Sequence, residues 1–108
     1  MSSLPKGELK PANAHILELT LEALRVAHTA SSAAAEGIAT GSQSVLRTLR
    51  EREKELDSLD RDVDDLVTAT ITGVGESQAR ELLACMKLVI SLERIGDLLL
   101  SFANRAEM

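Results

Sequence analysis

Glycine and proline residues divide this chain of 108 residues into three segments, and their placement limits the possible folds more than any other feature. Both residue types are disfavoured inside helices and favoured at helix ends and turns. The segments between them predict helices over 11–38, 42–72 and 76–106, each about 40 to 50 Å long. The breaks lie at Pro5, Gly7 and Pro11, at Gly37 and Gly41, and at Gly73 and Gly75.

Short connections between such helices make neighbouring helices antiparallel. The expected fold class is therefore all-α, an antiparallel three-helix bundle. Residues 1–10 are expected to form a flexible N-terminal segment, and residues 11–108 a single domain. The sequence has no Trp or Tyr and one Phe, so the core must come from Leu, Val, Ile and Ala, which suits closely packed helices.

Charge and hydropathy exclude several classes of protein. Acidic residues outnumber basic ones by 17 to 12, and this net charge of -5 gives no global support for nucleic-acid binding. The N-terminal residues have no apolar signal core, and no apolar run approaches the roughly 20 residues of a membrane helix. A single cysteine, Cys85, fits a reducing compartment. We therefore expect a cytoplasmic protein without direct membrane insertion.

The second and third expected helices differ in how much apolar surface they carry. In the second, apolar residues recur at three- and four-residue spacing and form one stripe. In the third, they cover nearly the whole circumference, although a three-helix bundle supplies only two neighbours to cover them. The surplus predicts a homodimer of six helices or docking onto another domain. These apolar residues are Leu82, Leu83, Leu88, Val89, Ile90, Leu92, Ile95, Leu98, Leu99, Leu100 and Phe102.

Carboxylates occur in both of these helices at positions close to the core. Glu93 and Asp97 are four residues apart, so they share a face of the third helix, and that face is otherwise apolar. Carboxylates facing a core are unfavourable unless they are paired, hydrogen-bonded or bound to a cation. On a helical wheel, four acids of the second helix share the edge of its apolar stripe. They are Glu53, Asp57, Asp60 and Asp64.

Two acid-x-x-x-acid pairs could face each other in an antiparallel bundle and form a cage of oxygen ligands. The pairs are Asp60 with Asp64 and Glu93 with Asp97. Such a cage suits Mg²⁺, Ca²⁺, Mn²⁺ or iron better than copper or structural zinc. Alternatively, nearby basic residues could pair with the acids, since acids at this spacing are common on exposed helices.

A basic stripe also runs along the third expected helix, where Arg80, Lys87 and Arg94 recur every seven residues. It could dock an acidic partner or phosphate. The preferred interpretation is a solvated edge whose basic groups pair with acids of the second helix.

Two motifs in the last half of the chain resemble the PhoU family of bacterial phosphate-signalling regulators. They are LERIGD, residues 92–97, and LDRDVDDL, residues 59–66, one helix earlier. The resemblance implies a three-helix bundle, which typical members carry twice in tandem, so that homodimerisation of this single copy would restore six helices. It also implies a cytoplasmic, non-enzymatic regulator that acts beside a phosphate transporter and a sensor kinase to repress phosphate-starvation genes.

The acidic motifs of the family bind iron, manganese or magnesium in some members, and by resemblance this role falls on Asp60, Asp64, Glu93 and Asp97. Glu53 and Asp57 form a further pair of less certain register. The chain departs from the family at the start of the third helix. There the family usually has Asp-Leu-Arg, and this chain has Gln-Ala-Arg, residues 78–80.

Two other functions remain open from the sequence. One is a metal-free structural or protein-interaction bundle, in which basic groups satisfy the acids. By the family resemblance, such a bundle would be, for example, a detached cytoplasmic domain of a sodium-phosphate cotransporter. The other is a small di-iron oxidation enzyme, which is disfavoured because the Glu-x-x-His signature of such sites is absent.

Overall fold

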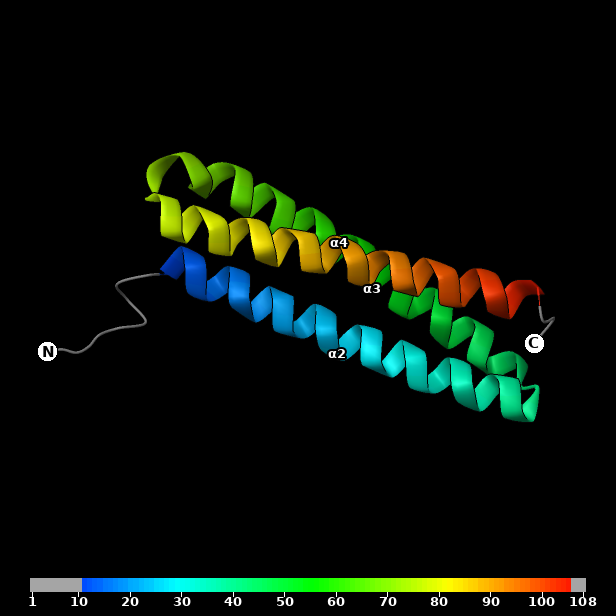
Figure 1. The fold of residues 1–108 in the computed structure, drawn as a ribbon. Coiled ribbons are helices and arrows are strands. Elements are labelled where there is room, and N and C mark those ends of the chain that lie inside the picture. Colours follow the sequence, from blue (N-terminus) through cyan, green and yellow to red (C-terminus); the bar gives the residue numbers. More distant parts are fainter. Residues whose placement is uncertain (1–10, 106–108) are drawn as a thin grey trace, which may run out of the picture.

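The computed structural model describes residues 11–105 and shows three long helices side by side (Figure 1). These are α2 (Pro11–Thr40), α3 (Gln43–Thr70) and α4 (Glu76–Arg105), with a single 3₁₀ turn, η1 (Ile71–Gly73), between α3 and α4. Helices α2 and α4 run in one direction and α3 runs in the other. The predicted all-α three-helix bundle is confirmed. The predicted flexible segment, residues 1–10, lies outside the described residues.

The helix ends lie within two residues of the predicted ones, and the differences have local causes. Helix α2 continues through Gly37, which is buried, and stops only at Gly41. Gly41 has φ +69°, in the left-handed region that favours glycine, and its N–H donates to the Gly37 carbonyl at 2.6 Å. At the end of α3, the chain tightens into the 3₁₀ turn instead of extending the α-helix to residue 72.

The core runs along the axis of the bundle in two clusters. The larger cluster joins all three helices through residues such as Ile16, Leu56, Val63 and Val89, none of which is exposed. The smaller cluster joins Ala30 and Ala34 of α2 to residues of α3 and to Ala103 of α4. The following residues complete the two clusters: Ala23, Val26, Ala27, Val67, Leu82 and Leu92 in the larger one, and Val45 and Leu49 in the smaller one.

Helices α3 and α4 approach each other closely at Gly96. This glycine is buried, and a Cβ atom placed on it would lie 2.7 Å from Cδ1 of Leu56. Leu56 is itself completely buried, so it has little room to move away. Only glycine therefore lets the backbone of α4 lie this close to α3, one residue before Asp97.

Candidate metal site

A group of three carboxylates bridges α3 and α4 beside this close approach. Glu53 comes from α3, and Glu93 and Asp97 come from α4. One ligand oxygen of each residue lies within 4.8 Å of the others. Glu53 and Glu93 are half-buried and Asp97 is exposed, so the group lies along the boundary between the two helices with one side open to water. We call these three residues the carboxylate group.

The helical geometry explains why these side chains converge. Glu93 and Asp97 are one turn apart on the same face of α4. Gly96, immediately before Asp97, allows that part of α4 to lie directly against α3. Because the two helices are antiparallel, Glu53, near the middle of α3, then meets the second half of α4.

The pKa of Glu53 is raised above its ordinary value of 4.5, first because the side chain is partly buried. A hydrogen bond with Asp97, which needs a proton shared between the two carboxyls, raises the pKa further, and so do the negative charges of Asp97, Asp57 and Glu93. The arrangement therefore favours either a proton or a cation between these oxygens.

Two neighbouring acids show the same effect. Partial burial raises the pKa of Glu93, and the charges of Asp97, Asp60 and Asp57 add to it, while the positive charge of Arg94 lowers it. Partial burial also raises the pKa of Asp60, followed by the charges of Asp64 and Asp57, against a lowering by Arg61. Negative potential therefore extends along α3 from the carboxylate group.

The structure brings together only part of the site expected from the sequence. Glu93 and Asp97 lie together, and Asp60 is close enough for its charge to act on Glu93. Asp64 is exposed, lies nearer the α3–α4 connection and is not one of the three grouped carboxylates. Glu53 takes its place at the centre. The expectation that Asp97 would face the core is wrong, because its side chain is exposed at the helix boundary.

The sequence signal for Glu53 was its place on the same edge of the second helix as Asp57 and Asp60. Glu53 and Asp57 were expected to form a further acidic pair, of less certain register. The role of Gly96 was not predicted, although a glycine inside a helix is a signal for a packing contact.

Basic side chains do not neutralise the carboxylate group. Among residues 11–105, every ion pair joins residues of the same helix, and none involves Glu53, Glu93 or Asp97. Arg61 pairs with Asp57 at 2.8 Å, and Arg80 pairs with Glu76 at 2.6 Å. The expectation that the basic stripe of the third helix pairs with acids of the second is therefore wrong for the described residues.

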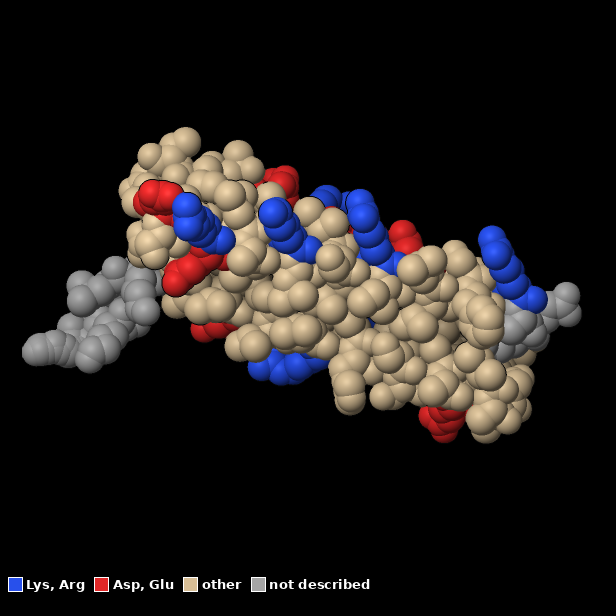
Figure 2. All heavy atoms as spheres, viewed as in Figure 1, with Lys and Arg blue, Asp and Glu red and all other residues tan. Residues whose placement is uncertain are grey.

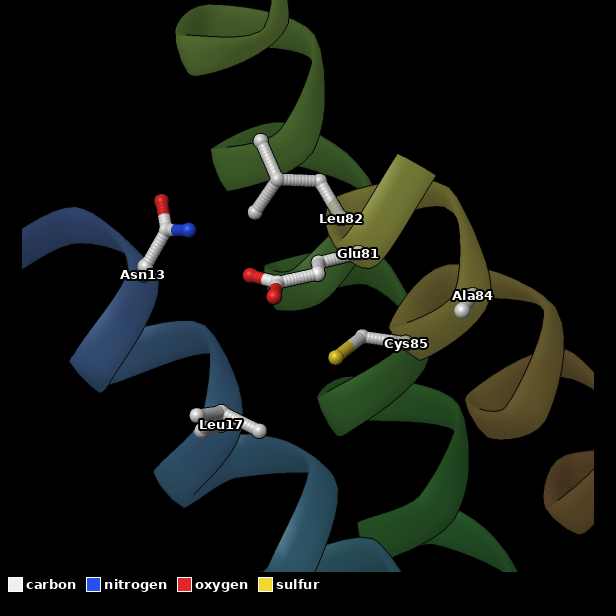
Figure 3. A pocket seen from close by; sticks show the side chains of 6 residues that line it. All are labelled: Asn13, Leu17, Glu81, Leu82, Ala84 and Cys85. Atoms are coloured by element: carbon white, nitrogen blue, oxygen red, sulfur yellow. The ribbon is translucent and has the colours of Figure 1, made fainter. Parts of the chain in front are cut away.

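A hollow in the described part of the molecule is separate from these acids. It has a volume of about 400 Å³ and lies between the N-terminal parts of α2 and α4 (Figure 3). Apolar groups dominate its lining, and the Glu81 carboxylate, the Asn13 amide and the Cys85 thiol also reach toward it. Nothing here repeats the three-carboxylate arrangement. The residues that line the hollow are Asn13, Leu17, Glu81, Leu82, Ala84 and Cys85.

An all-α bundle with an oxygen-rich site between two antiparallel helices is the class of protein that these features define. The chain belongs to the PhoU domain family, whose model matches residues 16–106. Comparison with curated proteins and with solved structures gave no match.

Membership of this family suggests a role in the regulation of phosphate transport. The family is regulatory and non-enzymatic, and its members interact with phosphate-transport proteins. None of the helices in residues 11–105 has the length and apolar character that crossing a membrane requires.

Proposed function

We propose that this chain is a non-enzymatic regulator of phosphate uptake and phosphate-starvation signalling that works as a cytoplasmic homodimer. In this proposal the carboxylate group binds a divalent or iron ion, and the loaded protein docks on phosphate-transporter or sensor-kinase proteins. The observation that carries the metal site is the convergence of three carboxylate oxygens from two helices within 4.8 Å, with no basic partner among the described residues.

The donor set fits a hard cation. Three carboxylates and no His or Cys suit Mg²⁺, Mn²⁺ or iron, and the open side of the group leaves room for water to complete the coordination. A bound cation would remove the repulsion between like charges that raises the pKa of Glu53 and Glu93. It would also link α3 to α4, so that binding of the ion would change the rigidity of the surface on which partner proteins dock.

One observation favours the metal-free alternative, a structural or protein-interaction bundle. The positive charge of Arg94 lowers the pKa of Glu93, which shows that a basic group acts on the site from a distance. We prefer the metal site because Arg94 forms no ion pair with the group among the described residues, and because no basic residue is among the causes that shift the pKa of Glu53.

A metal titration separates the two. Chelator-treated protein is titrated calorimetrically with Mg²⁺, Mn²⁺ and anaerobic Fe²⁺, beside Asp97→Ala and the matched control Asp62→Ala on the exposed face of α3. We expect saturable binding that Asp97→Ala weakens by at least the roughly tenfold that follows loss of a supporting ligand contact, and that Asp62→Ala leaves unchanged. Equal effects would place the site elsewhere, and no binding by folded wild type would favour the metal-free bundle.

The same variants test the regulatory role in cells. A bacterial strain whose own gene for this protein has been deleted expresses the wild-type protein, Asp97→Ala or Asp62→Ala. The activity of a phosphate-starvation promoter is then measured in phosphate-rich medium. We expect wild type and Asp62→Ala to repress the promoter and Asp97→Ala to leave it active. If none of the three proteins changes the promoter activity, the regulatory proposal is contradicted.

A further inference from the structure

Exposed apolar side chains gather on one face of the bundle, formed by α2 and α4. Leu17 and Ala84 line the same hollow, which shows which sides of the two helices meet there. On helical wheels, the other exposed apolar residues of α2 and α4 fall close to these sides, with Leu83 as the exception. We call the following residues the apolar face: Leu17, Leu21, Leu24, Ile38, Leu88, Ile95, Leu98 and Phe102.

The amount of exposed surface is large for a chain of this size. Exposure of these eight residues runs from 39 to 69 %, which adds up to about four fully exposed residues. Leucine and isoleucine are smaller than the aromatic residues, so at the low end of the aromatic range, about 150–200 Å² for each side chain, the apolar face offers on the order of 600–800 Å². This area is close to the roughly 800 Å² that each partner buries in a stable complex of ordinary size.

Charged residues border the apolar face on both long sides. Figure 2 looks onto this face and shows Lys and Arg side chains following one another along α4, with uncharged atoms filling most of the surface below them. On the wheel, Arg80, Lys87, Arg94 and Arg105 lie within about 40° of one another. We call these four residues the basic row.

Acids prevail along the opposite border, on α2. Glu18, Glu22 and Glu36 lie there with one basic residue, Arg25, which is held by Glu22 at 2.7 Å. The apolar face therefore lies between a basic border and a border that is acidic on balance.

We propose that the apolar face is the homodimer interface, with α4 of each protomer lying along α2 of its partner. This inference rests on the homodimeric form in the proposed function and specifies which surface forms it. A twofold axis parallel to the helices sets the basic row of one protomer beside the acidic border of the other. The other isologous arrangement, with the axis across the helices, would place the two basic rows against each other.

The parallel arrangement also matches charges by level along the bundle. Cys85 shares the hollow with Leu17, so Lys87 lies near the level of Glu18. Ala103 and Ala34 belong to the same core cluster, so Arg105 lies near the level of Glu36. An axis parallel to the helices keeps these levels, so Lys87 and Arg105 each meet an acid of the partner. Arg94 falls near the level of Arg25, whose charge is balanced by Glu22. The carboxylate group, between α3 and α4, stays outside the interface.

The first test compares two leucines of α4 by sedimentation analysis. Leu98→Glu changes the most exposed member of the apolar face, at 69 %, and Leu83→Glu changes an exposed leucine outside it, at 37 %. We expect a wild-type dimer, a loss of dimer affinity of about 100-fold in Leu98→Glu, and little change in Leu83→Glu. Circular dichroism verifies that both variants stay helical, and the calorimetric titration shows whether metal binding survives.

Three results would overturn the proposal. A wild-type monomer at micromolar concentration would do so, and a monomer that binds vesicles of anionic lipid would assign the face to a membrane surface. A dimer that Leu98→Glu and Leu83→Glu weaken equally would place the interface elsewhere. Dimerisation that persists without any metal binding would contradict the metal site alone, so the two failures can be told apart.

A charge exchange tests the orientation. The twofold axis repeats each pair, so reversing Lys87 and Arg105 to Glu removes four exposed pairs from the dimer. At about 0.3–0.5 kcal/mol for each pair, the dimer should weaken by at least about tenfold. Adding Glu18→Lys and Glu36→Lys to the same chain should restore most of the affinity. If the fourfold variant remains as weak as the double one, the parallel arrangement is wrong.

Discussion

Two sides of α4 carry different unfavourable features: unpaired carboxylates on one side, and exposed apolar side chains on the other. Toward α3, Glu93 and Asp97 meet Glu53, so that like charges lie together with no basic partner among the described residues. On the outer face that it shares with α2, the helix exposes apolar side chains, bordered on the side away from α2 by a row of basic ones. The first side lacks positive charge, and the second lacks cover for apolar surface.

This difference teaches where the function of so small a bundle is located. The buried residues between the helices hold the fold together, and neither the carboxylate group nor the apolar face belongs to that core. Residues that serve stability agree with their surroundings, whereas residues that conflict with them are candidates for function. A cation would satisfy the first side and a second copy of the chain would satisfy the other.

The strongest way to disturb this comparison is to remove the contact that holds the α3 side together. Leu56 is fully buried beneath Gly96, so Leu56→Ala should lower the free energy of unfolding by about 2–5 kcal/mol. Urea denaturation of the metal-free protein at one concentration measures the loss. A loss below about 1 kcal/mol would show that α3 and α4 do not depend on this contact.

A smaller effect is expected at the glycine above it. In Gly96→Ala, the new Cβ would lie 2.7 Å from Cδ1 of Leu56, and this overpacking of about 1–3 kcal/mol outweighs the roughly 1 kcal/mol that alanine gains in a helix. We expect a net loss of about 1 kcal/mol and weaker metal binding, since α4 must move away from Glu53. Gly73→Ala, which meets nothing within 4 Å, is the matched control for packing.

The two substitutions can also be combined. Leu56→Ala removes the atom that Gly96→Ala strikes, so in that background the glycine substitution should become neutral or stabilising. An undiminished loss in the double variant would mean that the close approach of the helices is not the reason for the glycine.

The sequence was sufficient to predict the fold. Glycine and proline positions and the period of the apolar residues placed all three helices to within two residues, because these signals are local. The end of α2 shows where such a prediction stops. From the sequence, Gly37 and Gly41 are equally good candidates for the end of the helix, and only the positive φ of Gly41 in the structure identifies it as the residue that ends α2.

The candidate site could be predicted only in part. Glu93 and Asp97 share a face because of their spacing, which the sequence contains. Their partner on α3 depends on how far one helix slides along the other, and that is set by the turn of residues 71–75 and by the contact of Gly96 with Leu56. Neither is visible as a pattern, so Asp64 was chosen where the structure places Glu53.

The smallest expected effect is a change in the pH dependence of stability. It concerns only the carboxylate group and leaves the apolar face unchanged. The pKa of Glu53 is raised above 4.5 in the folded protein, so the stability it contributes is complete below about pH 4.5 and is lost as the pH rises through the raised value. At pH 7 the ionised group therefore destabilises the metal-free fold. Glu53→Gln should unfold at higher urea concentration than wild type at pH 7, by less than the effect of Gly96→Ala, and the gap should close as the pH falls toward 4.5.

A bound metal ion should make wild type more stable than Glu53→Gln, the reverse of their order without metal, because the cation binds the ionised carboxylates. With Mn²⁺ present, wild type should be the more stable protein at pH 7 and should lose that advantage on acidification, whereas the glutamine variant should gain little from the ion. Asp62→Asn, on the exposed face of α3, should follow wild type under both conditions. If Glu53→Gln and wild type have the same pH profile, Glu53 does not share its charge with Asp97, and the acidic side of α4 is then an ordinary solvated edge.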